Sequence, residues 1–67
     1  MERYEFILKN RLEIKRLRDF GQMKVNYMPD GSTRIHAELP DQSALYALIN
    51  KIRDMNIKLV SFRQIMD

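Results

Sequence analysis

The sequence has 67 residues, of which 45% are hydrophobic and 31% charged. These fractions are typical of a globular domain and exclude a disordered tail, and the length fits a single domain spanning residues 1–67. A chain of this size buries only about 60% of its unfolded surface, which predicts a marginal core. The sequence contains no cysteine, which excludes disulfides and thiolate ligands.

The sequence also indicates the cellular compartment in which we expect the protein. No apolar stretch approaches the roughly 20 residues that a membrane-spanning helix needs. The opening Met1-Glu2-Arg3-Tyr4-Glu5 mixes acidic and basic groups, and the apolar segment of a secretory signal does not follow it. We therefore expect a cytoplasmic protein without a membrane partner.

The net charge of +3 comes entirely from the first third of the chain. Residues 1–24 hold seven basic and four acidic side chains, whereas residues 25–67 hold five of each. A basic cluster can attract polyanions such as RNA or DNA. The interleaved acids equally fit the solvated flanks of a strand and a short helix. Candidate polyanion contacts are Arg11, Lys15, Arg16 and Arg18.

Residues 3–9 are rich in aromatic and branched side chains and predict a strand. Its apolar face would consist of Tyr4, Phe6 and Leu8. Residues 13–19 change to a helical spacing, with Ile14 and Leu17 on one side. No clear N-cap precedes them, so they predict a short helix with a loop as the alternative.

Residues 22–39 predict a β-hairpin. Two runs of alternating apolar and polar side chains flank Pro29-Asp30-Gly31-Ser32. Proline presets φ, aspartate accepts local backbone hydrogen bonds and glycine supplies a positive φ, as a tight turn requires. One face of this hairpin should be dry and the other wet.

A helix is predicted from about 42 to 55. Pro40 ends the preceding strand, Asp41 can cap the helix, and Asn56 can end it in the left-handed conformation. Its apolar stripe would consist of Leu45, Leu48, Ile49, Ile52 and Met55.

Residues 57–65 predict the last strand, but its two faces are similar. Either Val60 and Phe62 point inward, which we favour, or Ile57 and Leu59 do. The resulting element order is β-α-β-β-α-β, the ferredoxin-like pattern, with right-handed crossovers. We expect an α+β fold with a four-stranded antiparallel sheet, the first and third strands central and both helices on one face. If residues 13–19 form a loop, the order becomes β-β-β-α-β around the same core.

With both helices on one side, the other face of the sheet is exposed. Candidate interaction residues there are Ile7, Lys9, Lys24, Asn26, Met28, Arg34, His36 and Glu38, beside Glu5. A mixed polar and apolar face on a domain with a marginal core favours association. The expected partner is a second copy or an unidentified protein, and a monomer is the alternative.

The residues that could carry chemistry do not form a recognisable site. His36 is the sole histidine, and with Glu38 it offers two metal ligands without a third. The two glycines cannot form a phosphate-binding loop. We predict no catalytic, metal or cofactor site, and expect Lys24, Arg34 or His36 to contact an acid across strands.

Three functions remain open. The preferred one is a non-enzymatic interaction or regulatory module that acts through the exposed sheet face. The second is weak RNA or DNA binding, although Tyr4, Phe6 and Tyr27 fall on the dry face and cannot stack on bases as in the RNA recognition module. The third is a small-ligand sensor, by analogy with ferredoxin-like dimers.

The second half of the chain carries a longer motif. It runs through Leu39-Pro40-Asp41-Gln42-Ser43-Ala44-Leu45, Ile52-Arg53-Asp54-Met55 and Leu59-Val60-Ser61. It resembles a group of small bacterial proteins of no known activity, in which a D-Q-A-A-L helix running to R-I-R-D-L-G leads into an L-x-L-[LV]-S strand. Tyr46-Ala47 stand where that group often has His-Gly, and Asn56 replaces a glycine. The resemblance implies a shared fold without implying a function.

Overall fold

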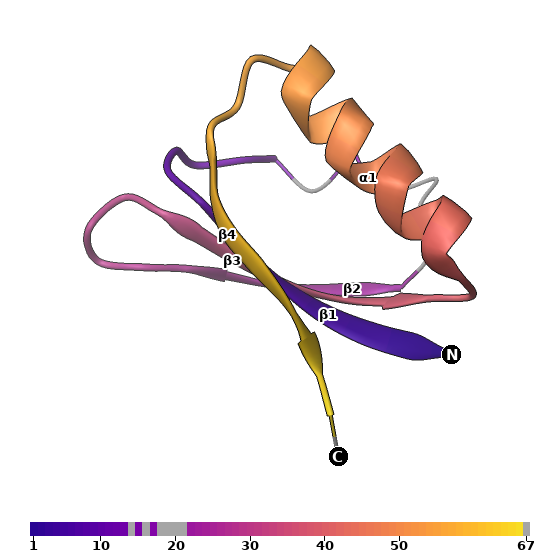
Figure 1. Cartoon of the computed structure of the whole chain (residues 1–67). Coiled ribbons are helices and arrows are strands. Elements are labelled where there is room, and N and C mark those ends of the chain that lie inside the picture. The colour runs from indigo at the N-terminus through magenta and orange to yellow at the C-terminus, as the bar shows by residue number, and fades with distance from the viewer. Residues whose placement is uncertain (14, 16, 18–21, 67) are drawn as a thin grey trace.

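The computed structural model describes residues 1–13, 15, 17 and 22–66. In this part of the chain the elements are β1 (Glu2–Leu8), β2 (Met23–Tyr27), β3 (Thr33–Leu39), α1 (Gln42–Asp54) and β4 (Leu59–Ile65). The strands form one sheet in the order β2-β3-β1-β4, and all neighbours are antiparallel. Helix α1 packs over one face, and no other described element covers the opposite face (Figure 1).

The prediction of a two-helix ferredoxin-like fold is wrong, because the described residues contain a single helix. Of the predicted first helix at 13–19, residues 14, 16, 18 and 19 lie outside the described part of the chain. The predicted four-stranded antiparallel sheet, with β1 and β3 central, is present. A small-ligand sensor rested on the ferredoxin-like analogy and loses its basis with it.

Thr33 anchors the chain that follows β1. Its hydroxyl donates to the carbonyl oxygen of Asn10 at 2.8 Å and accepts from the backbone N–H of Leu12 at 3.1 Å. These backbone groups are thus committed to a side chain of β3, and Leu12 and Leu17 are both buried in the core. This anchor joins the chain after β1 to a side chain more than twenty positions further along the sequence.

The predicted β-hairpin is confirmed, and it connects β2 and β3. Met28 N–H donates to the carbonyl oxygen of Ser32 at 2.9 Å, which closes the turn. Asp30 Oδ1 accepts from Ser32 N–H at 2.9 Å. Gly31 has φ of 89°, a conformation that favours glycine.

Helix α1 also follows its predicted signals. Asp41 Oδ1 accepts from the N–H of Ala44 at 2.9 Å, as an N-cap does, and Asn56 has φ of 59° just after the helix. Within the described residues, no helix has the length and apolar character that crossing a membrane requires.

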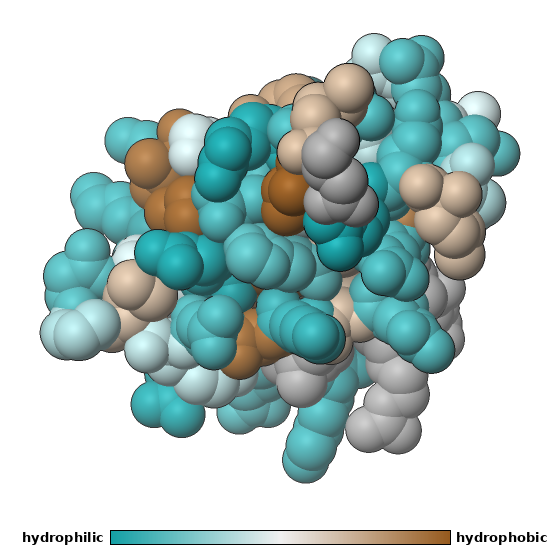
Figure 2. All heavy atoms as spheres, turned by 90° about the horizontal axis from the view of Figure 1, so that it is seen from below, coloured by the Kyte–Doolittle hydropathy of each residue, from teal (hydrophilic) through white to brown (hydrophobic). Residues whose placement is uncertain are grey.

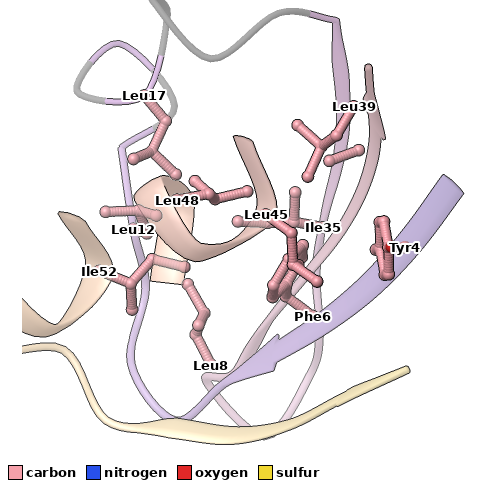
Figure 3. Packing of buried hydrophobic residues seen from close by; sticks show 11 residues of the cluster. Tyr4, Phe6, Leu8, Leu12, Leu17, Ile35, Leu39, Leu45, Leu48 and Ile52 are labelled. Atoms are coloured by element: carbon pink, nitrogen blue, oxygen red, sulfur yellow. The ribbon is translucent and has the colours of Figure 1, made fainter. Parts of the chain in front are cut away.

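The core lies between α1 and the sheet (Figure 3). Leu45, Leu48 and Ile52 form the buried stripe of the helix. The buried apolar side chains around them are Tyr4, Phe6, Leu8, Leu12, Leu17, Ile35, Ala37 and Leu39. Most of this cluster belongs to the two central strands, so these strands and α1 determine which sheet face remains outside.

Strand β4 departs from the inward face that the sequence favoured. Phe62 does face α1, opposite Phe6, with ring centroids 6.0 Å apart. Val60, however, is 57% exposed, and Leu59 instead lies opposite Leu8 and packs on the core. The register between β1 and β4 shifts at this point, as at a β-bulge. One extra residue there places Leu59 and Phe62 on the same side, which strict alternation cannot do.

Candidate functional site

The face of the sheet opposite α1 is the candidate site, and we call it the open face. Side chains alternate along strands, so the residues between the core positions point here. Its members are Arg3, Glu5, Ile7, Lys24, Asn26, Arg34, His36, Glu38, Ser61, Arg63 and Ile65. Figure 2 shows that hydrophilic side chains cover most of this side of the molecule, with separate apolar patches between them.

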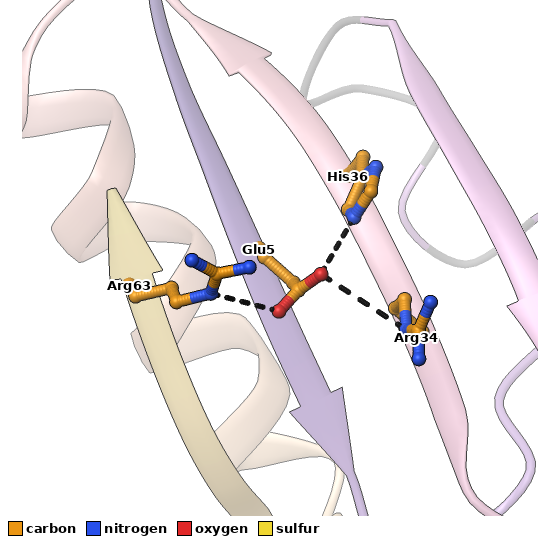
Figure 4. A network of polar contacts seen from close by, with 4 residues as sticks. All are labelled: Glu5, Arg34, His36 and Arg63. Atoms are coloured by element: carbon orange, nitrogen blue, oxygen red, sulfur yellow. Dashed lines mark hydrogen bonds and ion pairs between the residues drawn. The ribbon is translucent and has the colours of Figure 1, made fainter. Parts of the chain in front are cut away.

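Glu5 lies at the centre of the open face and contacts cations from both neighbouring strands (Figure 4). His36 Nε2 is 2.8 Å from Glu5 Oε2, and because a carboxylate only accepts, the imidazole N–H donates. Arg63 Nε donates to Glu5 Oε1 at 3.0 Å from β4. Arg34 Nε lies 4.0 Å from Glu5 Oε2, which is ion-pair distance. Strands β3, β1 and β4 are therefore joined by polar side chains on this face.

These contacts change the chemistry of the carboxylate. The hydrogen bond from His36, and then that from Arg63, lower the pKa of Glu5 below its ordinary value of 4.5. Its side chain is only 14% exposed, whereas Arg34 and Arg63 remain 39% and 70% exposed. Glu5 is thus a half-buried counter-ion, and the arginines that it contacts still face solvent.

A pocket of about 470 Å³ opens at one end of the open face. The register explains its position, because Lys24 is opposite His36 and Arg3 is opposite both Glu38 and Ile65. All four strands therefore contribute to it. Its lining consists of Arg3, Gln22, Met23, Lys24, His36, Ala37, Glu38 and Ile65.

The open face is basic and has no aromatic side chain among its described members. Four cations, from Arg3, Lys24, Arg34 and Arg63, stand against two acids, Glu5 and Glu38. The aromatic residues of the central strands, Tyr4 and Phe6, are buried under α1 instead. These two rings are therefore not available on the open face for stacking against bases.

The structure brings together six of the eight predicted interaction residues. Ile7, Lys24, Asn26, Arg34, His36 and Glu38 share the open face. Lys9 follows the end of β1, where its N–H donates to the carbonyl oxygen of Lys58 at 2.9 Å. Met28 lies in the turn after β2. The predicted cross-strand contacts of Arg34 and His36 with Glu5 are confirmed.

The candidate polyanion contacts do not form one site in the described residues. The guanidinium of Arg11 stacks on the Tyr27 ring at 4.3 Å from its centroid, next to the opposite edge of the sheet from β4. Lys15 is exposed. Arg16 and Arg18 lie outside the described residues.

Sequence reasoning missed the contribution of Arg3, Arg63 and Ile65 to the open face. Arg63 and Ile65 were not named because both faces of the last strand were left open, although the favoured inward Phe62 already implies that they point to the open face. Arg3 is next to Tyr4, whose burial already implied that Arg3 points outward. This neighbour relation was the available signal.

The described members of the open face include one histidine, His36, two acids, Glu5 and Glu38, and one hydroxyl, Ser61. No group of three or more His, Cys, Asp or Glu side chains suitable for a metal occurs in this part of the chain. His36 lies opposite Glu5 and bonds to it, whereas Ser61 lies opposite Ile7. The imidazole is therefore engaged with a carboxylate and is out of register with the nearest strand hydroxyl.

The geometry defines a small α+β domain in which one helix covers one face of a four-stranded antiparallel sheet. Residues 3–63 match the model of the domain of unknown function DUF8691, and the chain belongs to this family. Comparison with curated proteins and with solved structures gave no significant match to either. The family match covers β2, β3, α1 and most of β1 and β4, so the open face apart from Ile65 lies within the family domain.

Proposed function

We propose that this protein is a non-enzymatic interaction module whose open face binds an acidic segment of a partner protein. The observation that carries the proposal is the ordered excess of cations on this face. Glu5 hydrogen-bonds to His36 and Arg63 and lies at ion-pair distance from Arg34, while both guanidinium groups stay partly exposed to solvent.

Charge supports an acidic partner. Lys24 and Arg34 lie on neighbouring strands of the open face, and Lys24 also lines the pocket. Carboxylates of a bound segment could pair with exposed guanidinium groups in a bidentate manner. Because such contacts are partly exposed, we expect modest affinity and a clear dependence on salt.

Apolar side chains add a contact that small anions cannot use. Ile7 and Ile65 are half-buried on the open face, and Ile65 lines the pocket. An acidic segment with an apolar residue between its carboxylates would match this surface, because its carboxylates could contact the cations while its apolar residue contacts the isoleucines. Interfaces of this kind combine an apolar centre with a charged rim.

Nucleic-acid binding is the second candidate function, supported by the same cations. Binding to phosphates would need no aromatic platform, but it would be weak and would fall steeply with salt. The burial of Tyr4 and Phe6 under α1 removes the stacking contacts that strengthen single-strand binding. We therefore place the acidic protein segment first.

A matched pair of variants tests the proposal. Anisotropy of a fluorescent oligoglutamate peptide would be measured with the full chain, with Lys24→Gln and with Lys51→Gln. Both lysines are exposed, but Lys51 lies on α1, away from the open face. We expect Lys24→Gln to weaken binding roughly fivefold, the equivalent of about 1 kcal/mol, and Lys51→Gln to leave it unchanged.

Two results would contradict the proposal. An equal loss of peptide affinity in both variants would mean that binding depends on the overall charge of the chain and not on the open face. Tighter binding of single-stranded DNA or RNA than of the peptide at physiological salt, with the same dependence on Lys24, would replace the acidic segment with a nucleic acid.

A further inference from the structure

Strand β4 is an unusually exposed edge. It pairs with β1 on one side and has no described strand on the other. Five consecutive residues, from Val60 to Gln64, are exposed. The outer backbone groups of an edge strand are available to pair with another strand, and natural proteins usually block such edges with charge, proline or a short length.

The side chains of β4 provide little of that protection. Val60 and Phe62 are 57% and 46% exposed, and the seven-residue strand contains no proline and no acid. Its one charge, on Arg63, is held by Glu5 at 3.0 Å. The β-bulge beside Val60 interrupts the ladder at the start of the strand only, so regular backbone continues from Ser61 onward.

The opposite edge of the sheet is different. Strand β2 has five residues, and Pro29 follows it shortly. Tyr27 donates its hydroxyl proton to the carbonyl oxygen of Leu12 at 2.8 Å and carries the Arg11 guanidinium on its ring. Lys24 places a further charge on this edge. The sheet is thus protected at β2 and open at β4.

We propose that β4 pairs antiparallel with β4 of a second copy, across a two-fold axis at Phe62. This register places Phe62 opposite the partner's Phe62 and Ser61 opposite the partner's Arg63. A register centred on Arg63 would instead set two like charges opposite each other, which is unfavourable. One centred on Ser61 would place the irregular backbone at Val60 inside the central pairs. Of the registers centred on Ser61, Phe62 and Arg63, the one on Phe62 alone avoids both problems.

The pairing would bury apolar surface that is exposed in the single chain. Phe62 and Phe6 already stack on the α1 side of the sheet, and the second Phe62 would cover the exposed edge of this pair. A 67-residue domain gains from such added burial. Because a two-fold axis perpendicular to the sheet keeps like faces together, both open faces would join into one continuous surface. This inference uses β4 and does not depend on the acidic partner.

The association itself can be measured by sedimentation equilibrium of the full chain over a wide range of concentration. We expect a concentration-dependent dimer. Val60→Lys, at an exposed position on the strand, should raise the dissociation constant at least about tenfold, because lysine on an edge opposes pairing. Tyr46→Lys, at a 58% exposed aromatic on α1, is the matched control and should leave it unchanged. Circular dichroism would confirm that both variants are folded.

Disulfide capture tests the register, since the chain has no cysteine of its own. Residues directly opposite across antiparallel strands have Cβ atoms about 4.5–5.5 Å apart, close to the reach of a disulfide. Phe62→Cys should therefore form a covalent dimer under mild oxidation, and Val60→Cys and Asn26→Cys should not. The double variant Val60→Cys with Gln64→Cys should cross-link again.

A monomer at all accessible concentrations overturns the proposal. A dimer that is unaffected by Val60→Lys would show that β4 is not the interface. A dimer that cross-links through Asn26→Cys on β2 in preference to Phe62→Cys would show the same.

Discussion

The two faces of the sheet are built from the same strands, yet different interactions order them. Under α1, Phe6 and Leu48 are fully buried, and apolar contact holds the layers together. On the open face, Glu5 joins three strands through cations that remain exposed to solvent. The first arrangement determines whether the chain folds, whereas the second can change without loss of the core. The open face is therefore where this domain can carry function.

The largest effect should follow from damage to the covered face. Phe6→Ala should reduce the free energy of unfolding by about 3–5 kcal/mol, because it removes a buried ring and leaves a cavity. In so small a domain this loss should leave much of the chain unfolded. Urea denaturation followed by circular dichroism measures it. Ile7→Ala, next in the same strand but on the open face, is the control, and an equal loss there would contradict the difference between the faces.

The next effect concerns the anchor between the sheet and the chain after β1. Thr33→Val should reduce the free energy of unfolding by about 1–3 kcal/mol, because the N–H of Leu12 and the carbonyl of Asn10 lose their partner. Thr33→Ser keeps the hydroxyl and should recover most of this loss. Thermal and urea denaturation would compare the three proteins, and equal stability of the Val and Ser variants would refute the role of the hydroxyl.

A smaller effect is expected at the start of α1. Asp41→Ala should reduce the free energy of unfolding by about 1 kcal/mol, because the N–H of Ala44 loses its capping acceptor. Asp54→Ala, at the other end of the helix, removes the same charge from a position where an acid is unfavourable to the helix dipole. Denaturation should therefore show a loss for the first variant and none for the second.

The smallest effect belongs to the open face. Glu5→Gln should reduce the free energy of unfolding by no more than about 1 kcal/mol at neutral pH, because its cationic partners are largely solvated. The folded-state pKa of Glu5 lies below the ordinary 4.5, so its stabilisation is complete above that value. It is lost as the pH falls through the folded-state pKa, because the folded chain must then be protonated as well.

Denaturation of Glu5→Gln and of the natural chain at several pH values measures this dependence. The difference in stability between the two proteins should be present at pH 7 and should vanish in acid. A difference that persists unchanged at pH 3 would show that the carboxylate charge is not what stabilises this face.

Local sequence signals predicted the parts of the fold that depend on one segment. Asp30 and Gly31 determine the hairpin turn, and Asp41 with Asn56 determines the ends of α1. The two aspartates accept hydrogen bonds from neighbouring backbone N–H groups, and Gly31 and Asn56 adopt a positive φ, so each signal is contained in a few consecutive positions. The alternation in β1 and β3 likewise identified the core face, because both strands lie at the centre of the sheet.

Features of the fold that depend on residues far apart in the sequence could not be predicted from such local signals. Asn10 and Leu12 hydrogen-bond to the hydroxyl of Thr33, which lies more than twenty positions along the chain, and no local spacing reveals this contact. The inward face of β4 depends on a bulge relative to β1, which alternation within β4 cannot reveal. Arg63 was not named because both faces of the strand were left open, although the favoured inward Phe62 places it on the side of Glu5.

The central claim is that the open face binds an acidic segment. It is tested most directly by amide chemical-shift mapping of the isotope-labelled full chain during titration with an oligoglutamate peptide. The claim predicts shifts concentrated in β1, β3 and the open-face positions of β2 and β4, around Lys24, Arg34 and Arg63, with α1 unaffected. Shifts confined to α1, or spread equally to Lys51 and Lys58, would contradict it.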